Sequence, residues 1–250
     1  MVSVNNNYIF NNVGLNGIKF RGARQIYLPP SFSANDNYQT NPLYDSFGNK
    51  SEIESIARAN PRIREISKEY GIPIKVNDKE LKNLKCGHLV GTRITAAKIY
   101  SNLPDAMKST VDSEVLQEAA MFHDYGKILI PEDILSKEGA LTADEWDIMK
   151  QHAEIGFELL KNKNLHPRAL ELIKYHHQTA NGEGYPMNDS NYSYGLDSEI
   201  LAVADKYEAL REKRSYKDSL PPEEALNIIY EDVKSGAVSQ EVFDALKKSV

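Results

Sequence analysis

Two pairs of adjacent ionisable residues could do chemistry in this chain. The segment "MFHDYGK" places His123 beside Asp124, and "YHHQ" places His176 beside His177. Consecutive residues of a helix point about 100° apart, so a doublet converges on one point only at a frayed helix end, or else serves two nearby ions. Both doublets lie near the end of a predicted helix, before "YGK" and before "QTANGEG". The candidate set is His88, His123, Asp124, His152, His176, His177 and Asp205.

The side-chain types of this set indicate a metal site. Imidazole and carboxylate without thiolate favour iron, manganese, zinc, cobalt or nickel. Asp205 lies within the apolar run "ILAVADKYEAL", where an unpaired inward-facing carboxylate is costly and a divalent cation removes that cost. Seven ligands are too many for one ion but suit two, with one carboxylate as the bridge. Two metals about 3.5–4 Å apart activate water and hold the oxygens of an in-line phosphoryl displacement, so the residues predict a dinuclear phosphohydrolase.

Composition excludes several other classes of protein. The chain has 250 residues, 41% of them hydrophobic and 26% charged, which is typical of a globular domain with a substantial core. No apolar stretch approaches the ~20 residues of a membrane span, and "MVSVNNNYIF" lacks the basic and apolar parts of a secretory signal. The net charge of −6 argues against binding long nucleic acid. A single cysteine, Cys86, fits a reducing cytosol, so we expect a cytoplasmic protein without a membrane segment. The oligomeric state stays open, with a homodimer as one option.

The elements that position the candidate ligands are predicted to be helices. Residues 1–50 are rich in asparagine and their aromatics show no helical period, so we expect a poorly structured arm before an all-helical domain over residues 51–250. Capping signals include Thr142 with Glu145 in "TADE" and Pro167 in the first turn of the helix that ends near "YHHQ". One longer helix is predicted from about Asn77 to Tyr100. With no alternating strand pattern, the fold class is all-α, a helical bundle.

The motifs resemble one known family. "HDYGKILIPEDILSKEGALTADEWDIMKQHAEIG", "HHQTANGEGYP" and "ILAVADKYEALREKRSYKDSLPPEEAL" follow one another in the order and at the distances of the HD superfamily, and specifically of the HD-GYP cyclic di-GMP phosphodiesterases. The resemblance covers about residues 82 to 246. It implies a helical bundle of the HD-GYP type that hydrolyses cyclic di-GMP to linear pGpG, or onward to GMP, with two divalent metal ions, iron or manganese.

The resemblance also implies a role for each site residue. One metal would take His88, His123 and Asp205, and the other His152, His176 and His177, with Asp124 as the bridge. Lys127 would lie near the scissile phosphate and stabilise developing charge. Tyr185 of "GYP" would stack on a guanine or contact its edge, and Arg214 and Lys217 would contact phosphate.

Four positions depart from the family pattern. Leu84 stands where members with a third metal carry a glutamate, so two metals are expected rather than three. Gln178 replaces a glutamate after the histidine pair, and Arg211 and Ser215 replace the usual threonine and proline of the basic segment. These changes leave all seven predicted metal ligands in place.

Two other functions compete with the phosphodiesterase. One is a metal-loaded receptor that holds the cyclic dinucleotide without turnover, which the altered loop residues leave open. The other is an HD phosphohydrolase for another nucleotide, such as a different cyclic dinucleotide or a guanosine polyphosphate. A mononuclear HD hydrolase would leave His152, His176 and His177 without a role.

Overall fold

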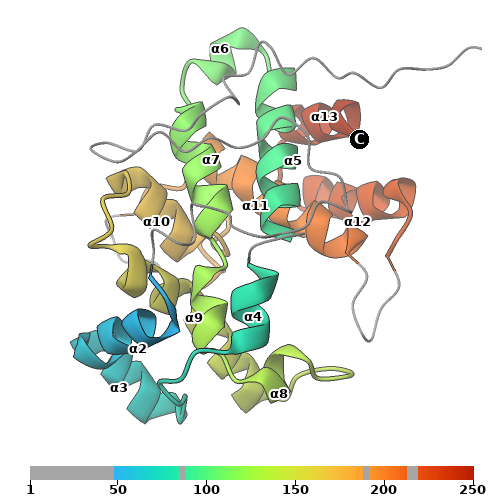
Figure 1. Cartoon of the computed structure of the whole chain (residues 1–250). Coiled ribbons are helices and arrows are strands. Elements are labelled where there is room, and N and C mark those ends of the chain that lie inside the picture. Colours follow the sequence, from blue (N-terminus) through green and yellow to red (C-terminus); the bar gives the residue numbers. More distant parts are fainter. Residues whose placement is uncertain (1–47, 85–87, 188–191, 213–218) are drawn as a thin grey trace, which may run out of the picture.

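The computed structural model describes residues 48–84, 88–187, 192–212 and 219–250, and every regular element named in these ranges is a helix (Figure 1). The predicted all-α class is confirmed. The expected N-terminal arm falls outside the described residues except for its last three. The elements are α2 (Lys50–Ala59), α3 (Pro61–Tyr70), α4 (Asp78–Asn83), α5 (His88–Asn102), α6 (Asp105–Lys108), α7 (Ser113–Phe122), the 3₁₀ helix η1 (Tyr125–Leu129), α8 (Glu132–Leu135), α9 (Ala143–Leu160), α10 (Pro167–Tyr175), α11 (Leu196–Arg211), α12 (Pro222–Lys234) and α13 (Gln240–Ser249).

Short polar side chains begin most of these helices. The Thr142 hydroxyl accepts a hydrogen bond from the backbone N–H of Glu145, and the Glu145 carboxylate accepts one from the backbone N–H of Thr142. The predicted capping box of α9 is therefore confirmed. Pro167 occupies the first turn of α10, as the sequence indicated, and Ser239 caps α13. Helix α3 ends at Gly71, whose φ of 68° is the left-handed conformation of a helix C-cap.

The prediction of one helix from Asn77 to Tyr100 is wrong. The structure has two elements there, because α4 ends at Asn83 with Leu84 as its C-cap, and α5 is described from His88 onward. Leu84 forms a turn between them and is buried in the core.

The core is built around α5 and α9. Helix α5 packs against α7, α11 and α13, while α9 packs against η1, α10 and α3 (Figure 1). Figure 1 shows α5, α7 and α11 together in the middle of the molecule, with α2 and α3 at one end. No helix among the described residues has the length and apolar character that crossing a bilayer requires.

Candidate metal centre

Both doublets lie at the C-terminal ends of helices, as predicted. His123 is the C-cap of α7, and Asp124 follows it before η1 begins. His176 is the C-cap of α10, and His177 comes after it. Because the regular helix ends at these positions, adjacent side chains are free to turn toward one region. Helix α9 supplies His152, and the remaining two candidates come from α5 and α11.

The structure brings all seven predicted ligands together in two groups. Within each group, one ligand atom from every residue lies within 4.8 Å of the others. Asp124 belongs to both groups, and it is the one residue that they share. The first group is His88, His123, Asp124 and Asp205, and the second is Asp124, His152, His176 and His177.

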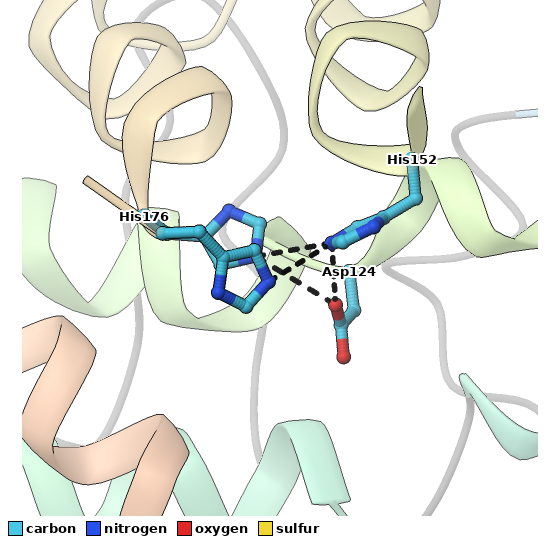
Figure 2. Close-up of side chains that lie close together, drawn as sticks. Asp124, His152 and His176 are labelled. Atoms are coloured by element: carbon cyan, nitrogen blue, oxygen red, sulfur yellow. Dashed lines mark hydrogen bonds and ion pairs between the residues drawn. The ribbon is translucent and has the colours of Figure 1, made fainter. Parts of the chain in front are cut away.

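The two carboxylate oxygens of Asp124 face different groups. Oδ1 lies 3.3 Å from Nε2 of His152 and 3.8 Å from Nε2 of His176, and Figure 2 shows these three side chains converging. Oδ2 lies 3.6 Å from Nε2 of His88 and 3.4 Å from Nε2 of His123. A carboxylate in this orientation can give one oxygen to each of two cations.

Three of the histidines are oriented by their own helices. Nδ1 of His123 lies 2.9 Å from the carbonyl oxygen of Ala120, and the rings of His152 and His176 make the same contact with the carbonyl three residues earlier, at 2.6 and 2.8 Å. A carbonyl oxygen only accepts, so Nδ1 carries the proton in each ring. Nε2 is therefore the nitrogen left to face the cluster, which is how metal-binding histidines are commonly held.

The charge states inside the cluster suit cation binding. Burial lowers the pKa of His152 to about 3 and that of His177 to about 4, and it holds the pKa of His176 well below its ordinary value. These three imidazoles are thus neutral at pH 7, which is the protonation state a metal ligand needs. Burial raises the pKa of Asp124 and of Asp205, but their cationic neighbours outweigh burial and keep both carboxyls ionised.

The two carboxylates of the first group stabilise positive charge on the side chains next to them. Burial lowers the pKa of His123, but the carboxylates of Asp124 and Asp205 outweigh it and raise that pKa to about 10. Lys127 adds a second cation, and its Nζ lies 2.6 Å from Oδ2 of Asp124. Burial lowers the pKa of Lys127, and the two carboxylates raise it further than burial lowers it.

Unsatisfied polar atoms test whether a metal fits the cluster. Nε2 of His123 and Oδ1 of Asp124 are buried and make no hydrogen bond among the described residues. Nε2 of His152 and Nε2 of His176 face each other at 3.2 Å, although both rings carry their proton on Nδ1. Two lone pairs at this distance repel, and a cation between them removes the repulsion. The donor set therefore fits divalent metal, and its nitrogen and oxygen atoms fit iron, manganese or zinc.

A close approach of backbones places η1 against α9. A Cβ built on Gly126 would lie 1.9 Å from the carbonyl oxygen of His152, a distance that only glycine avoids. Gly126 thus lets the turn after the His123–Asp124 doublet touch the helix that carries His152. The sequence contained this glycine within "HDYGK" but gave no sign of its packing partner.

The loop after the second doublet folds back onto it. Tyr185 forms an isolated antiparallel bridge with His177, and its ring stacks on the His177 ring with centroids 4.5 Å apart and planes 29° from parallel. A Cβ on Gly184 would meet the His177 carbonyl oxygen at 2.1 Å, so this return also depends on glycine. One face of the predicted guanine-contacting Tyr185 is therefore occupied by a histidine of the cluster.

Gln178 has a structural role that a glutamate could not take in the same form. Its side chain is buried, and Nε2 donates a hydrogen bond of 2.5 Å to the carbonyl oxygen of Pro186. An ionised glutamate has no proton to donate there. The departure from the family pattern thus closes the loop that carries Tyr185 and leaves the predicted ligands in place.

The structure describes Leu84 and Arg211 but not the other predicted positions of the basic segment. Arg214, Lys217 and Ser215 lie outside the described residues. The chain on either side of them is fixed, because the backbone N–H of Leu220 donates to the Leu210 carbonyl at 3.1 Å, and the Arg211 side chain donates to the carbonyl of Leu220. Leu84, which stands in place of a glutamate, is 2% exposed and has an apolar side chain that cannot bind a cation.

Sequence reasoning missed one residue beside the site. Trp146 of α9 contacts the Tyr185 ring edge to face, with centroids 5.8 Å apart. The two residues are far apart in the sequence, and only the fold of the loop brings them together. The available signal was that Trp146 is the single tryptophan of the chain.

Comparison with known proteins agrees with this geometry. The family model described as an HD domain matches residues 58–241, most of the chain. The chain belongs to the HD domain family. The resemblance to its HD-GYP members, predicted from the motifs, is confirmed.

Curated relatives of this HD domain are cyclic dinucleotide phosphodiesterases. It is 40% identical over 135 residues to a cyclic di-GMP phosphodiesterase of Thermotoga maritima, covering 53% of this chain and 36% of that protein. It is 38% identical over 125 residues to a cyclic di-GMP phosphodiesterase response regulator of Xanthomonas campestris, covering 49% and 33%. A 3'3'-cGAMP-specific phosphodiesterase of Vibrio cholerae is 39% identical over 109 residues, covering 43% and 21%. The matches span about a third of the length of these relatives or less.

A solved structure has the same fold. An HDG"Y"P protein from Bdellovibrio bacteriovorus superposes with a TM-score of 0.52 at 14% identity, covering 87% of this chain and 74% of that one. At this identity the likeness concerns the fold alone. It agrees with the helical bundle of the HD-GYP type that the sequence predicted.

Proposed function

We propose that this protein is a dinuclear-metal phosphodiesterase that hydrolyses cyclic di-GMP to linear pGpG. The observation that carries the proposal is the division of the Asp124 carboxylate, whose Oδ1 faces His152 and whose Oδ2 faces His88 and His123. A single metal would need only one of these groups. The substrate class is supported by relatives named as cyclic di-GMP phosphodiesterases.

In this proposal each group holds one divalent ion, iron or manganese. His88, His123 and Asp205 would hold the first, His152, His176 and His177 the second, and Asp124 would contribute to both. Such a pair of ions supplies Lewis acidity for phosphodiester hydrolysis, by activating water and neutralising charge on phosphate oxygens. The helix carbonyls that fix the three imidazole tautomers then act as supports, because they keep Nε2 aimed into the cluster.

Lys127 is proposed as the residue that stabilises charge growing on the phosphate. Its ammonium is held against Asp124 at 2.6 Å, beside both groups, and its raised pKa keeps it charged. A preorganised charge in a buried site costs no reorganisation when the reaction occurs. Tyr185 is proposed to border the nucleotide, and Arg214 and Lys217 to contact its phosphates.

The mixed cyclic dinucleotide 3'3'-cGAMP is a second candidate substrate. A relative at 39% identity is specific for 3'3'-cGAMP, a mixed cyclic dinucleotide, and its identity to this chain is close to that of the cyclic di-GMP relatives. The proposal of a cyclic dinucleotide phosphodiesterase covers both substrates, and the choice between them depends on how the bases are bound.

The test is a turnover assay on protein purified without oxygen and loaded with iron or with manganese. Cyclic di-GMP and 3'3'-cGAMP are each incubated with the protein, and products are separated by chromatography. We expect pGpG from cyclic di-GMP with one or both metals, and later appearance of GMP would show a second cleavage. Tight binding of either dinucleotide without cleavage would overturn the enzyme and establish the receptor instead.

A further inference from the structure

A series of aromatic rings leads from the metal centre to the surface. The His177 ring stacks on Tyr185, and Tyr185 meets Trp146 at a centroid distance of 5.8 Å with ring planes 81° apart. The Tyr185 ring also lies 6.3 Å from the His152 ring. The indole is thus one ring removed from two histidines of the second ligand group.

The outer end of this series is exposed. Trp146 is 46% exposed, although α9 is otherwise packed against several elements of the core. Met187, two residues after Tyr185, is 92% exposed. Large apolar side chains gain free energy from leaving water. The exposed Trp146, which contacts Tyr185, and the exposed Met187, two residues along the chain from it, therefore indicate a surface that something else covers.

The geometry of the indole suits a planar ligand. Because Trp146 and Tyr185 are nearly perpendicular, Tyr185 does not cover the indole by parallel stacking. Tyr185 itself is already stacked on His177, and it is far less available to a second ring. Aromatic side chains stack on the π-face that every nucleobase has, and indole offers the largest face among the side chains.

We propose that Trp146 is the platform on which one nucleobase of the substrate stacks, with Tyr185 as the support that fixes the indole. This inference rests on the proposed function, because a phosphate at the ligand group of His177 places an attached base at the rim where Trp146 lies. It shifts the base-stacking role from the "GYP" tyrosine to a residue of α9. It also identifies a contact through which guanine and adenine could be distinguished by stacking strength.

The single tryptophan gives a direct readout. On metal-loaded wild-type protein, cyclic di-GMP added to the cuvette should quench the indole fluorescence in a saturable way, because a stacked base quenches an excited indole. The half-saturating concentration should agree with KM from the turnover assay. Turnover without any change in fluorescence would overturn the inference, and it does so without requiring a variant to fold.

Kinetics of three variants complete the test. Trp146→Ala should raise KM about 5- to 100-fold, the range expected for loss of one base–aromatic stack, while kcat and metal content change little. Trp146→Phe should restore most of the affinity because it keeps an aromatic face. Tyr230→Ala is the control, since Tyr230 is 39% exposed on α12, a helix that carries none of the seven predicted ligands.

The outcomes separate this inference from the proposed function. Turnover by wild type with an unchanged KM for Trp146→Ala would refute the platform and leave the phosphodiesterase standing. A fall in kcat and in metal content with KM unchanged would make Trp146 a structural support only, and would also refute it. If wild-type protein neither binds nor cleaves a cyclic dinucleotide, the proposed function fails and the platform fails with it.

Discussion

The ammonium of Lys127 lies 2.6 Å from Oδ2 of Asp124, the oxygen that also faces His88 and His123. Oδ1, the other oxygen of the same carboxylate, lies 3.3 Å from Nε2 of the neutral His152. The shared carboxylate is therefore electrostatically asymmetric. A cation at the first group is repelled by Lys127 more strongly than a cation at the second.

Lys127→Ala should keep both metals and lower kcat. The lysine is not a ligand, and its charge is proposed to act on the transition state, so loss of about 10²–10³ in kcat is expected with little change in KM. Metal affinity of the first group should rise, because the repelling charge is gone. Metal titration and steady-state kinetics measure both effects. Lys234→Ala on α12, whose lysine pairs with Glu231, is the control, and a wild-type kcat in Lys127→Ala would exclude a catalytic role.

The number of bound metals follows from the two groups and from Leu84. With an apolar buried residue where a third site would need a carboxylate, we expect two iron or manganese equivalents per chain. Elemental analysis of protein purified without oxygen measures this number. A fully loaded value of one or of three would contradict the assignment.

Asp124→Ala should empty both sites and abolish turnover, because each group loses the same carboxylate. Elemental analysis and the turnover assay give the readout. The matched control is His166→Asn: the His166 side chain accepts a hydrogen bond from the backbone of Arg168 at the start of α10, and asparagine can replace this cap. Loss of a single metal with activity retained would show that Asp124 is not shared.

Gly126→Ala should lower both the melting temperature and the metal content. The added methyl would collide with the carbonyl oxygen of His152 and push η1 from α9, at a cost of about 1–3 kcal/mol or more. Gly156→Ala tests the same contact from α9, where the new Cβ would lie 3.2 Å from the Gly126 nitrogen. Its loss of melting temperature and metal content should be smaller than that of Gly126→Ala. Equal effects of the two substitutions would mean that this contact does not position the doublet.

The buried carboxyl of Glu118 should make the stability of the folded state depend on pH. Burial raises its pKa to about 7 from an ordinary value of 4.5, although the backbone N–H of His166 donates to its carboxylate. The folded state therefore binds more protons than the unfolded state between these pH values, and Glu118 costs stability progressively as pH rises from about 4.5 through 7. Glu118→Gln removes the ionisation, so its advantage in melting temperature over wild type should grow across this window and stay constant above it.

Melting curves at pH 4.5, 6 and 8 for both proteins check this sign. Glu114→Gln, at an exposed position of the same helix, is the control for the substitution itself. An advantage for Glu118→Gln that shrinks with rising pH would show that the carboxylate is stabilising in the folded state.

The sequence predicted the site better than it predicted the packing around it. The doublets were interpretable because helix geometry prevents adjacent residues from converging, and both indeed lie at helix ends. The end of α4 at Asn83 was missed because "LKNLKCGHLV" continues the apolar period of a helix and contains no proline. The contacts of Gly126 with His152 and of Trp146 with Tyr185 join distant segments, and no local pattern in one sequence encodes such pairs.

Two helices end at the candidate metal centre, and their C-termini have a consequence of their own. The aligned peptide dipoles of α7 and α10 place a partial negative charge at His123 and at His176, next to the ligand groups. This contribution comes from the backbone, so it persists in every side-chain variant considered above. Ligand-depleted variants should therefore keep a residual, weak attraction for cations, set by the electrostatic potential of the fold rather than by any donor atom.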